Sequence, residues 1–563
     1  MKRLHIAILV VSLAACHAKE DVARPAAAVG PAPTQAPPPA LGFLDESREG
    51  TPVEGGVLRR RLVGEPATLN AVLQSGLPEQ QVLQYVSRQL VDFDPLLELV
   101  GNLAERWTVS DDGLEYRFFL QRDAVWEDGT PVTSADAVFT IRRIVDAKVP
   151  SPVFKPLFES LAVIEAVDPA SFRARFRERD AFHAYAFALP LLPAHRFEGQ
   201  SFLKARDNRA PLANGPYRVA KWKTQESIAL ERNPRWKGAA GHFDRIVFRI
   251  VQENAVAYRA LVEGDLDETW IDQPLKERST ADRRFQSCCR VVEFYNLDYN
   301  YVGLNNRSPF FSDPRVRRAM TMLLDRPAIV QGLYGGSARI ISGPWAPDSP
   351  AYDASVTPLP FDPREAGELL DRAGWRDTNG NGTRDRAGRE FEFDLLVSAG
   401  SNAGRQIDEI FAAELARAGI RARIRPLEWA AFTERVDSGA YEAATLGWAA
   451  ADPNPDPYPY WHSSQFPPRG LNGSYYSNPA ADRLMEEARR ELDAEKRREI
   501  YHRLHRVFRD DPPVVFVVNA TQKYAFRRRV HGLVTSPLGL FGFSPGPLSW
   551  WGTPDDEVPA TRK

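Results

Sequence analysis

One short pattern in the sequence has the spacing of a catalytic motif. Residues 542–546 read Gly-Phe-Ser-Pro-Gly, as in a hydrolase nucleophile elbow, where the backbone N–H after the serine stabilises the oxyanion. Pro545 has no N–H to donate. That fold also needs a histidine after its serine, whereas the last histidine, His531, precedes Ser544. The sequence therefore predicts a protein that is not an enzyme and has no catalytic residues.

Two further patterns have the spacing of metal ligands. His502 and His505 stand three apart in a segment with helical periodicity, which can present two imidazoles to one ion. Arginines surround them, so we expect a solvated helix face. Residues 377–385 copy the first half of a calcium loop, but its twelfth position, which needs a bidentate glutamate, is Gly388. The Asn-Gly repeats favour a turn, with a structural calcium ion as the alternative, and we expect no cofactor.

The three cysteines are too few for a disulfide framework. Cys288 and Cys289 lack the spacing of a zinc or redox motif, so we expect two half-buried residues entering a strand, with a vicinal disulfide as the alternative. Cys16 ends the sequence Leu-Ala-Ala-Cys, after a basic start and an apolar run. This looks like the lipobox of bacterial lipoproteins, in which the cysteine is acylated. We predict a signal peptide at 1–15 and lipidation of Cys16.

The chain after Cys16 is rich in proline and alanine. Such a stretch stays extended and solvated and has little to bury in a core. We predict a tether over 16–51 that holds the folded part away from the lipid surface. The folded region is expected to begin near residue 52.

The remaining sequence alternates between helical and strand-like patterns, which predicts a mixed α/β fold. Thr133 opens a helix as a capping box with Asp136, and Asp313 followed by proline opens another. A helix over 402–419 is expected to lead into a strand at 420–425. Residues 480–511 are expected to be helical with a break at Asp493. The apolar run 514–518 is then typical of a buried strand.

Composition limits the class of protein. The chain has 563 residues, 43% hydrophobic and 26% charged, with a formal net charge of −2. This is globular composition with length for roughly three to four domain-sized units. No charge excess favours nucleic acid as a partner, and no apolar run reaches the roughly 20 residues of a membrane-spanning helix. Any membrane attachment must therefore come from the lipid anchor.

Further motifs are spread along the folded region and agree in order and spacing with one protein family. They are Glu-Pro-Ala-Thr-Leu-Asn at 65–70, Leu-Ala-Glu-Arg-Trp at 103–107, Trp-Glu-Asp-Gly-Thr-Pro-Val-Thr-Ser-Ala-Asp at 126–136, Asn-Gly-Pro-Tyr at 214–217, Glu-Arg-Asn-Pro at 231–234, Asp-Pro-Arg-Val-Arg at 313–317, Gly-Trp at 447–448 and Tyr-Ser-Asn-Pro at 476–479. Over about 57–550 the chain resembles the family 5 extracellular solute-binding proteins, the oligopeptide and dipeptide receptors of ABC importers.

The resemblance implies a fold. It is the two-lobed periplasmic-binding-protein type II fold, α/β in class, with an extra domain inserted in the first lobe (cluster C). On this chain it places lobe one at 52–94, 206–300 and 516–563, the inserted domain at 95–205, and lobe two at 301–515. The lobes of such receptors close over the ligand by hinge motion.

The resemblance also implies a ligand cleft, in which a peptide is bound as an added strand. Gly76 and Leu77 match a lobe-one loop that pairs with the ligand. In lobe two, Trp429 and Trp448 match residues that wall the pockets, and Ala449 follows in a main chain that offers strand partners. Tyr301 lies in a tyrosine-rich strand that faces the ligand in the family. For each aromatic residue, packing in the core is the alternative.

The sequence departs from the family's peptide receptors at the charged positions. An aspartate that binds the peptide amine is expected three residues after the tryptophan, but that position is Ala451 and Asp452 comes one later. A one-residue shift in an extended segment turns the side chain to the other face. The arginines that meet a peptide carboxylate correspond to Val436 and Thr445, with Arg435 adjacent. We retain Asp452 as the candidate residue for the amine, and Asp456 is interpreted as a turn residue.

These features lead to one functional prediction with two alternatives. The chain is expected to be a monomeric, extracytoplasmic or periplasmic lipoprotein that captures peptides and delivers them to the permease and ATPase complex of an ABC importer. A receptor for an oligosaccharide, an opine-like compound or a metal chelate is the first alternative. An exported hydrolase or a ligand sensor is the second.

Overall fold

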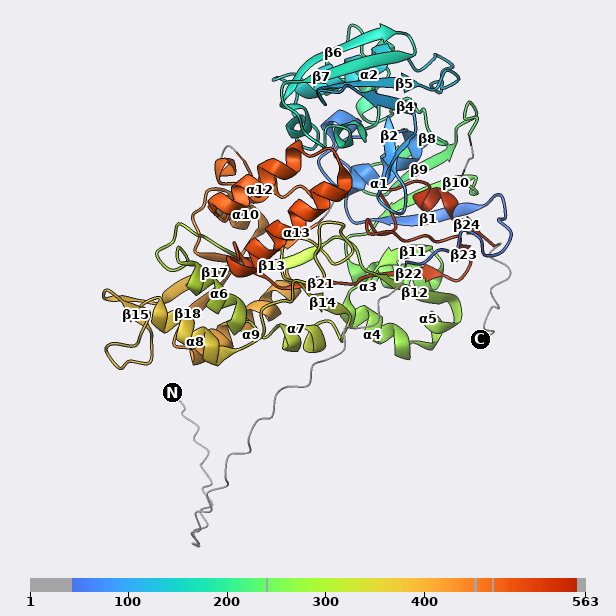
Figure 1. Cartoon of the computed structure of the whole chain (residues 1–563). Helices are drawn as coiled ribbons and strands as arrows, with labels where there is room; N and C mark the ends of the chain where they lie inside the picture. Colours follow the sequence, from blue (N-terminus) through green and yellow to red (C-terminus); the bar gives the residue numbers. More distant parts are fainter. Residues whose placement is uncertain (1–42, 239–240, 450–452, 468–469, 554–563) are drawn as a thin grey trace, which may run out of the picture. The chain divides into compact units, whose positions relative to one another are not determined.

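The structure is a computed structural model that describes residues 43–238, 241–449, 453–467 and 470–553 (Figure 1). The predicted signal peptide, Cys16, most of the predicted tether, Ala451 and Asp452 lie outside the described residues. In the described residues, no helix is both long and apolar enough to cross a membrane.

The first described residues pack against the end of the chain. The amide of Leu44 donates to Oγ1 of Thr535 at 2.8 Å, and the amide of Glu46 donates to the carbonyl of Leu533 at 2.8 Å. The Glu46 carboxylate forms an ion pair with Arg290. Packed structure thus begins within the stretch predicted as tether rather than near residue 52, because Glu46 is an ionic partner that composition does not reveal.

Two sheets and four helices form one part of the fold. A four-stranded sheet has the order β1-β10-β9-β8, and a three-stranded sheet has the order β11-β22-β12. The strands are β1 (Val57–Leu62), β8 (Tyr217–Lys223), β9 (Ser227–Arg232), β10 (Arg245–Ile250), β11 (Glu268–Trp270), β12 (Cys289–Phe294) and β22 (Gln522–Arg527). The helices are α1 (Leu77–Val86), α3 (Asn254–Glu263), α4 (Gln273–Ala281) and α5 (Arg283–Cys288). Three separated segments of the chain build this part, since β22 pairs with β11 and β12.

A second four-stranded sheet lies within 95–205 and has the order β4-β5-β7-β6. Its strands are β4 (Ala104–Val109), β5 (Glu115–Leu120), β6 (Leu161–Asp168) and β7 (Ser171–Phe176), and α2 (Ser134–Val145) contacts β6 and β7. Thr133 and Asp136 form the predicted capping box of α2. The hairpin β2 (Val91–Phe93) and β3 (Leu99–Gly101) precedes this sheet.

A five-stranded sheet organises 299–516, with the order β18-β17-β19-β13-β20. Its strands are β13 (Tyr299–Leu304), β17 (Glu392–Ser398), β18 (Arg421–Leu427), β19 (Ala443–Trp448) and β20 (Val515–Phe516). The helices are α6 (Pro314–Leu323), α7 (Arg326–Gly332), α8 (Pro363–Arg372), α9 (Asn402–Arg417), α10 (Trp429–Asp437), α11 (Tyr458–Trp461), α12 (Pro479–Arg490) and α13 (Ala494–Asp510). Val302, Leu304, Leu395 and Ala443 face a core that includes residues of α6, α8 and α9.

Short strands complete the described structure. They are β14 (Ala338–Ile340), which pairs with β21 (Val518–Ala520); β15 (Asp385–Arg386), which pairs with β16 (Arg389–Glu390); and β23 (Val530–His531), which pairs with β24 (Trp551–Gly552). The predicted buried strand at 514–518 is therefore divided between two sheets, with β20 in the five-stranded sheet and β21 beside β14.

Most locally encoded elements lie where the sequence predicts them. The helix over 402–419 is α9, followed by Gly419 at φ +78° and then by β18. The break at Asp493 is confirmed, because its side chain caps α13 by accepting from the amides of Glu495 and Lys496. Asp313 caps α6 in the same way, through the amide of Arg315.

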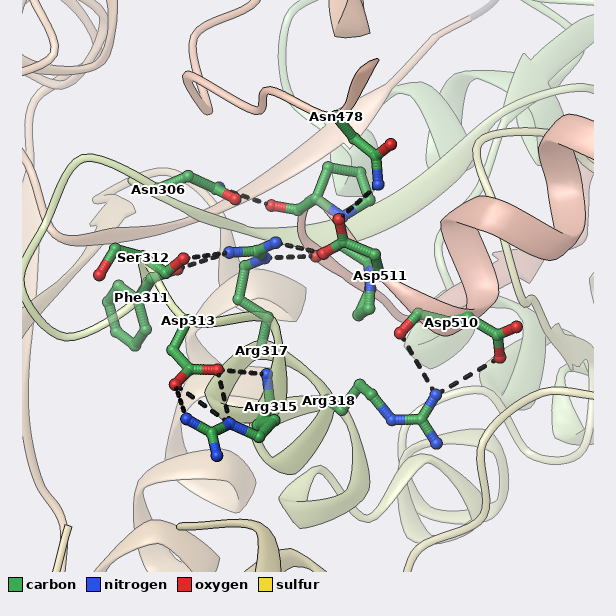
Figure 2. Close-up of polar contacts among 12 residues, drawn as sticks. Asn306, Phe311, Ser312, Asp313, Arg315, Arg317, Arg318, Asn478, Asp510 and Asp511 are labelled. Carbon is green, nitrogen blue, oxygen red and sulfur yellow. Dashed lines mark hydrogen bonds and ion pairs between the residues drawn. The ribbon is translucent and has the colours of Figure 1, made fainter. Parts of the chain in front are cut away.

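Several motif residues have a structural role in a polar network (Figure 2). Arg317 forms an ion pair with Asp511, and its Nε donates to the carbonyl of Pro512 at 2.9 Å. Asn478 Nδ2 donates to Asp511 at 2.8 Å, and Asn306 Nδ2 donates to the carbonyl of Pro513 at 3.0 Å. The network joins the starts of α6 and α12 to the end of α13, which explains these motifs without a ligand.

The solvated helix face predicted for the two histidines is wrong for His505. Its side chain is fully buried, where Nδ1 accepts from the amide of Asp353 at 3.1 Å and Nε2 lies 2.9 Å from Oγ of Ser342. Burial lowers the pKa of His505 to about 4, so the imidazole is neutral at neutral pH. The partners come from 342–353, far away in sequence, and helical spacing alone could not reveal them.

The turn predicted at 377–385 is closed by its own first residue. The Asp377 carboxylate accepts from the amides of Gly380 and Gly382 at 2.7 and 2.9 Å.

Cys288 and Cys289 are free cysteines, both buried, with Sγ atoms 2.7 Å apart, and Cys289 begins β12 as predicted.

Candidate ligand-binding site

One face of the five-stranded sheet gathers the aromatic residues that the sequence singles out. In the antiparallel pairing of β13 with β19, Tyr299 lies opposite Trp448 and Tyr301 lies opposite Leu446. Alternate residues of a strand point to the same face, so Tyr299, Tyr301, Leu446 and Trp448 share one side. The opposite side carries Val302 and the core under α9.

Aromatic rings pack together on this face. We define the aromatic cluster as Phe182, Tyr185, Tyr299, Tyr301, Trp345, Trp448, Tyr458, Tyr460 and Trp461, which all belong to one apolar group of side chains. The ring centroids of Trp448 and Tyr460 are 4.3 Å apart in an edge-on arrangement, and those of Tyr299 and Trp448 are 6.4 Å apart. Burial raises the pKa of Tyr301 to about 12. Tyr301 therefore offers a neutral ring and hydroxyl on this face.

Strand β19 has a free edge beside this cluster. β17 pairs with β19 at Ala443 and Ala444, whereas 445–448 pair with β13 on the other side. Within the described ranges, no strand pairs with the second edge of β19 beyond Ala444. Gly447 and Ala449 are exposed, so their backbone groups are accessible. An unpaired strand edge of this kind is a template for an added strand.

Trp429 lies on the same face of the sheet but at a distance along it from the aromatic cluster. It begins α10, is 65% exposed, and stacks on Phe432 with centroids 5.9 Å apart. Phe432 packs with Leu396, Ala444 and Leu446. Leu446, which lies opposite Tyr301 in the pairing of β13 with β19, therefore lies between the Phe432 group and the aromatic cluster.

The lobe-one residues of the predicted site lie at the start of α1. Gly76 is the extended N-cap at φ −153°, and Leu77 is the first helical residue, 55% exposed. No hydrogen bond within the described part of the chain joins either residue to β13 or β19. The structure therefore brings together Tyr301, Trp448 and Ala449 on β13 and after β19, while Gly76 and Leu77 lie at the start of α1, where Gly76 is half-buried and Leu77 is exposed.

Asp456 has the turn role interpreted from the sequence, since its Oδ1 accepts from the amide of Tyr458 at 3.1 Å, and its carboxylate is also buried in an ion pair. Its Oδ2 lies 2.6 Å from Nη2 of Arg489, and burial raises the pKa of its carboxyl. The Arg489 guanidinium also lies 3.9 Å from the centre of the Tyr458 ring and 3.6 Å from Oδ2 of Asp180. The amide of Ala181 donates to the Arg489 carbonyl at 2.8 Å. Arg489 therefore links the predicted inserted domain to the predicted lobe two at the rim of the aromatic cluster.

The positions expected to meet a peptide carboxylate have structural roles. Thr445 Oγ1 donates to the buried carboxyl of Asp408 on α9, on the face away from the cluster. Arg435 Nε donates to the carbonyl of Ala440 at 2.7 Å after the end of α10. Burial raises the pKa of Asp408 to about 8, so this carboxyl is largely protonated at neutral pH.

The part of the chain that the structure describes has no group of three or more His, Cys, Asp or Glu side chains placed to bind a metal ion. The arrangement instead offers aromatic walls, an open strand edge and an ionic link between two parts of the fold. These features suit a ligand that is held by its surface and its backbone.

Known proteins share this architecture. The model of the bacterial extracellular solute-binding proteins, family 5 middle, matches residues 98–468. The oligopeptide-binding protein AppA of Bacillus subtilis (strain 168) is 26% identical over 513 residues, covering 89% of this chain and 92% of AppA. The structure of AppA in complex with a nonapeptide has a TM-score of 0.76 and 25% identity, covering 90% of this chain and 100% of that one.

A more distant structure shows the same fold. NikA from Brucella suis in complex with Fe(III)-EDTA has a TM-score of 0.78 at 19% identity, covering 88% of this chain and 100% of that one. The periplasmic-binding-protein fold predicted from the sequence is thereby confirmed. The chain belongs to the family 5 bacterial extracellular solute-binding proteins and is a non-enzymatic solute-binding component of an ABC transporter.

Proposed function

We propose that this chain captures peptides as an added strand on β19 and delivers them to the permease of an ABC importer, while Cys16 anchors it to the membrane by a lipid. The observation that carries the peptide assignment is the unpaired edge of β19 beyond Ala444, beside the aromatic cluster. An unpaired edge offers hydrogen bonds to any peptide backbone, whatever its side chains.

The aromatic cluster supports the same assignment. Rings such as Trp448 and Tyr460 provide contact area without a fixed pattern of donors and acceptors, which suits varied peptide side chains. Asp456 is already paired with Arg489, so Asp452 remains the candidate for binding the peptide amine. Gly76 and Leu77 would supply the opposing contacts from lobe one when the lobes close, so that peptide binding favours the closed state.

The ligand class is tested by releasing what the protein carries. The full chain is purified from membranes, denatured, and the released small molecules are identified by mass spectrometry. A ladder of peptide masses is the expected result. A single sugar, opine-like compound or metal chelate would replace the peptide assignment with the corresponding receptor function.

The anchor is tested separately. Cells are labelled with palmitate, and the wild-type chain is compared with Cys16→Ala. We expect label on the wild-type chain alone, with Cys16→Ala released from the membrane fraction. Label retained on Cys16→Ala would refute lipidation at this residue.

A further inference from the structure

A cavity of about 630 Å³ lies at the C-terminal end of α1. Its walls include Arg88 after α1, Asn102 and Gln121 beside the β4–β5 sheet, and Asn214 and Trp236 on either side of β8 and β9. This volume is typical of a site for a small molecule. Gly76 and Leu77, the predicted peptide contacts, stand at the opposite end of α1, about 15 Å away for a helix of ten residues.

Phe543 separates the cavity from the aromatic cluster. It lines the cavity and packs in one apolar group with Phe93, Val534 and the cluster residue Tyr185. The amide of Ser544 donates to the carbonyl of Phe93 at 2.7 Å. This segment forms a packed wall, so the cavity is a compartment distinct from the β19 edge.

A hydrogen-bonded guanidinium forms the centre of the cavity wall. Arg88 Nε donates to Oδ1 of Asn102 at 2.7 Å, and both Nη atoms donate to Oε1 of Gln121 at 3.2 Å. The guanidinium carbon lies 5.2 Å from the centre of the Trp236 ring. In the described ranges no carboxylate lies within 4.0 Å of this guanidinium, so its hydrogen bonds go to neutral acceptors, while the Asp123 carboxylate attracts it from beyond that distance.

Asn214 adds an unused donor to the same wall. It is 2% exposed, and its Oδ1 accepts from the amide of Arg88 at 2.8 Å. Its Nδ2 has no hydrogen-bond partner among the described residues. A buried amide donor without a partner is unfavourable, and an acceptor on a bound molecule would satisfy it after a small rotation.

The charges around the cavity favour an anion. Arg88, Arg235 and Lys237 outnumber the two lining carboxylates. Asp92 is tied to Asn102, whose Nδ2 donates to it at 3.3 Å, and Asp123 is exposed, as are Arg235 and Lys237, so Arg88 is the one half-buried cation among these lining residues. The neutral part of the lining combines apolar residues, such as Trp236, Phe543 and Leu548, with amide and hydroxyl groups that can bond ligand hydroxyls, among them Gln84, Gln89 and Ser87.

We propose that this cavity is a second binding site that takes a small hydroxylated anion, either a hydroxycarboxylate or a sugar phosphate. The anionic group accepts hydrogen bonds from Asn214 and Arg235 beside the Arg88 charge, and the ligand hydroxyls bind the amide and hydroxyl lining. The site is independent of peptide capture on β19.

The proposal is tested by calorimetric titration of the full chain with gluconate, with glucose 6-phosphate and with glucose as the neutral probe. We expect one or both anions to bind and glucose not to bind. Binding of gluconate alone or of glucose 6-phosphate alone identifies the carboxylate or the phosphate as the recognised group. Failure of both anions, or equal binding of glucose, would overturn the proposal.

Variants and hydrogen exchange locate the binding. Arg235→Gln changes an exposed side chain and is expected to weaken anion binding at least fivefold, whereas Trp448→Ala leaves it unchanged. Bound anion is expected to protect amides at 84–92 and 542–549, and not at 445–449. Unchanged affinity in both Arg235→Gln and Arg88→Gln, or protection at 445–449 instead, would contradict the assignment of this cavity.

Discussion

The aromatic cluster and the cavity beside α1 are two regions held together by different interactions. Rings packed at centroid distances of 4.3 to 6.4 Å hold the walls of the cluster, and the open backbone edge of β19 lies beside them. Hydrogen bonds from Arg88 to Asn102 and Gln121 hold the wall of the cavity. Packed rings can contact different ligand side chains. Buried hydrogen-bond donors instead disfavour a ligand that lacks acceptors at the matching positions, because those donors stay unpaired. We therefore expect broad specificity at β19 and narrow specificity in the cavity.

The largest expected effect comes from the polar link at the rim of the cluster. Arg489→Met removes the partner of the buried Asp456 carboxylate and the contact with Asp180. Breaking a buried ion pair by removing one partner is strongly destabilising, so we expect a loss of about 3 kcal/mol in the free energy of unfolding by urea. The matched control is Arg490→Met, whose side chain is 69% exposed. Equal effects of the two variants would show that the rim does not depend on this link.

The second prediction concerns the carboxyl beneath the other face of β19. Burial raises the pKa of Asp408 to about 8, above its value of 3.8 in the unfolded chain. The protonated form is favoured in the folded state, so its stabilising effect is complete below about pH 4 and is lost as pH rises through about 8. Asp408→Asn should raise the free energy of unfolding at pH 8, because the amide stays neutral where the carboxyl is about half ionised, and should have little effect at pH 4. Urea unfolding at both pH values measures this, and an unchanged pH dependence would contradict the buried, protonated state.

The third prediction compares two tryptophans in peptide binding. Trp448→Ala removes a ring from the aromatic cluster and is expected to weaken peptide binding about tenfold, or about 1.4 kcal/mol. Trp222→Ala is the control, because Trp222 lies on β8 in a different sheet and its Nε1 donates to Glu65. Calorimetric titration of both variants with one peptide measures the difference. Equal affinities of the two variants for the peptide would show that the peptide does not contact the aromatic cluster.

The smallest effect is expected at Trp429. Its ring is 65% exposed, so Trp429→Ala should change the free energy of unfolding by less than about 0.5 kcal/mol. The affinity of the same variant for short and long peptides reports whether a ligand on the free edge of β19 extends to α10. A loss for long peptides alone would support this extension, and a loss for short peptides too would place Trp429 at the centre of the site.

The sequence predicted features that depend on neighbours in the chain or on the family resemblance. The capping box at Thr133 and the break at Asp493 follow from side chains that bond amides two or three residues away. The resemblance identifies Tyr301 and Trp448 as candidate site residues, and the pairing of β13 with β19 places both on one face of the sheet. The helix ends are encoded by neighbouring residues, and the aromatic positions are given by the resemblance to the family. Both can therefore be predicted from one sequence.

The features that sequence reasoning missed depend on distant partners. Asp456 meets Arg489 from 33 residues away, and His505 meets Ser342 from 163 residues away. Neither pairing leaves a local pattern in the sequence. The residues around Asp456 therefore predict only its turn, and the arginines around His505 predict a surface position. The alternating prolines at 453–457 are a sequence signal that this segment has restricted backbone freedom.

The most direct test of peptide capture on β19 is a calorimetric comparison of one peptide with its backbone N-methylated form, using the full chain. N-methylation removes amide donors and leaves every side chain in place. Binding by strand addition predicts at least a tenfold loss of affinity on methylation, and much smaller changes when peptide side chains are exchanged. Equal affinity for the methylated peptide would contradict binding by strand addition.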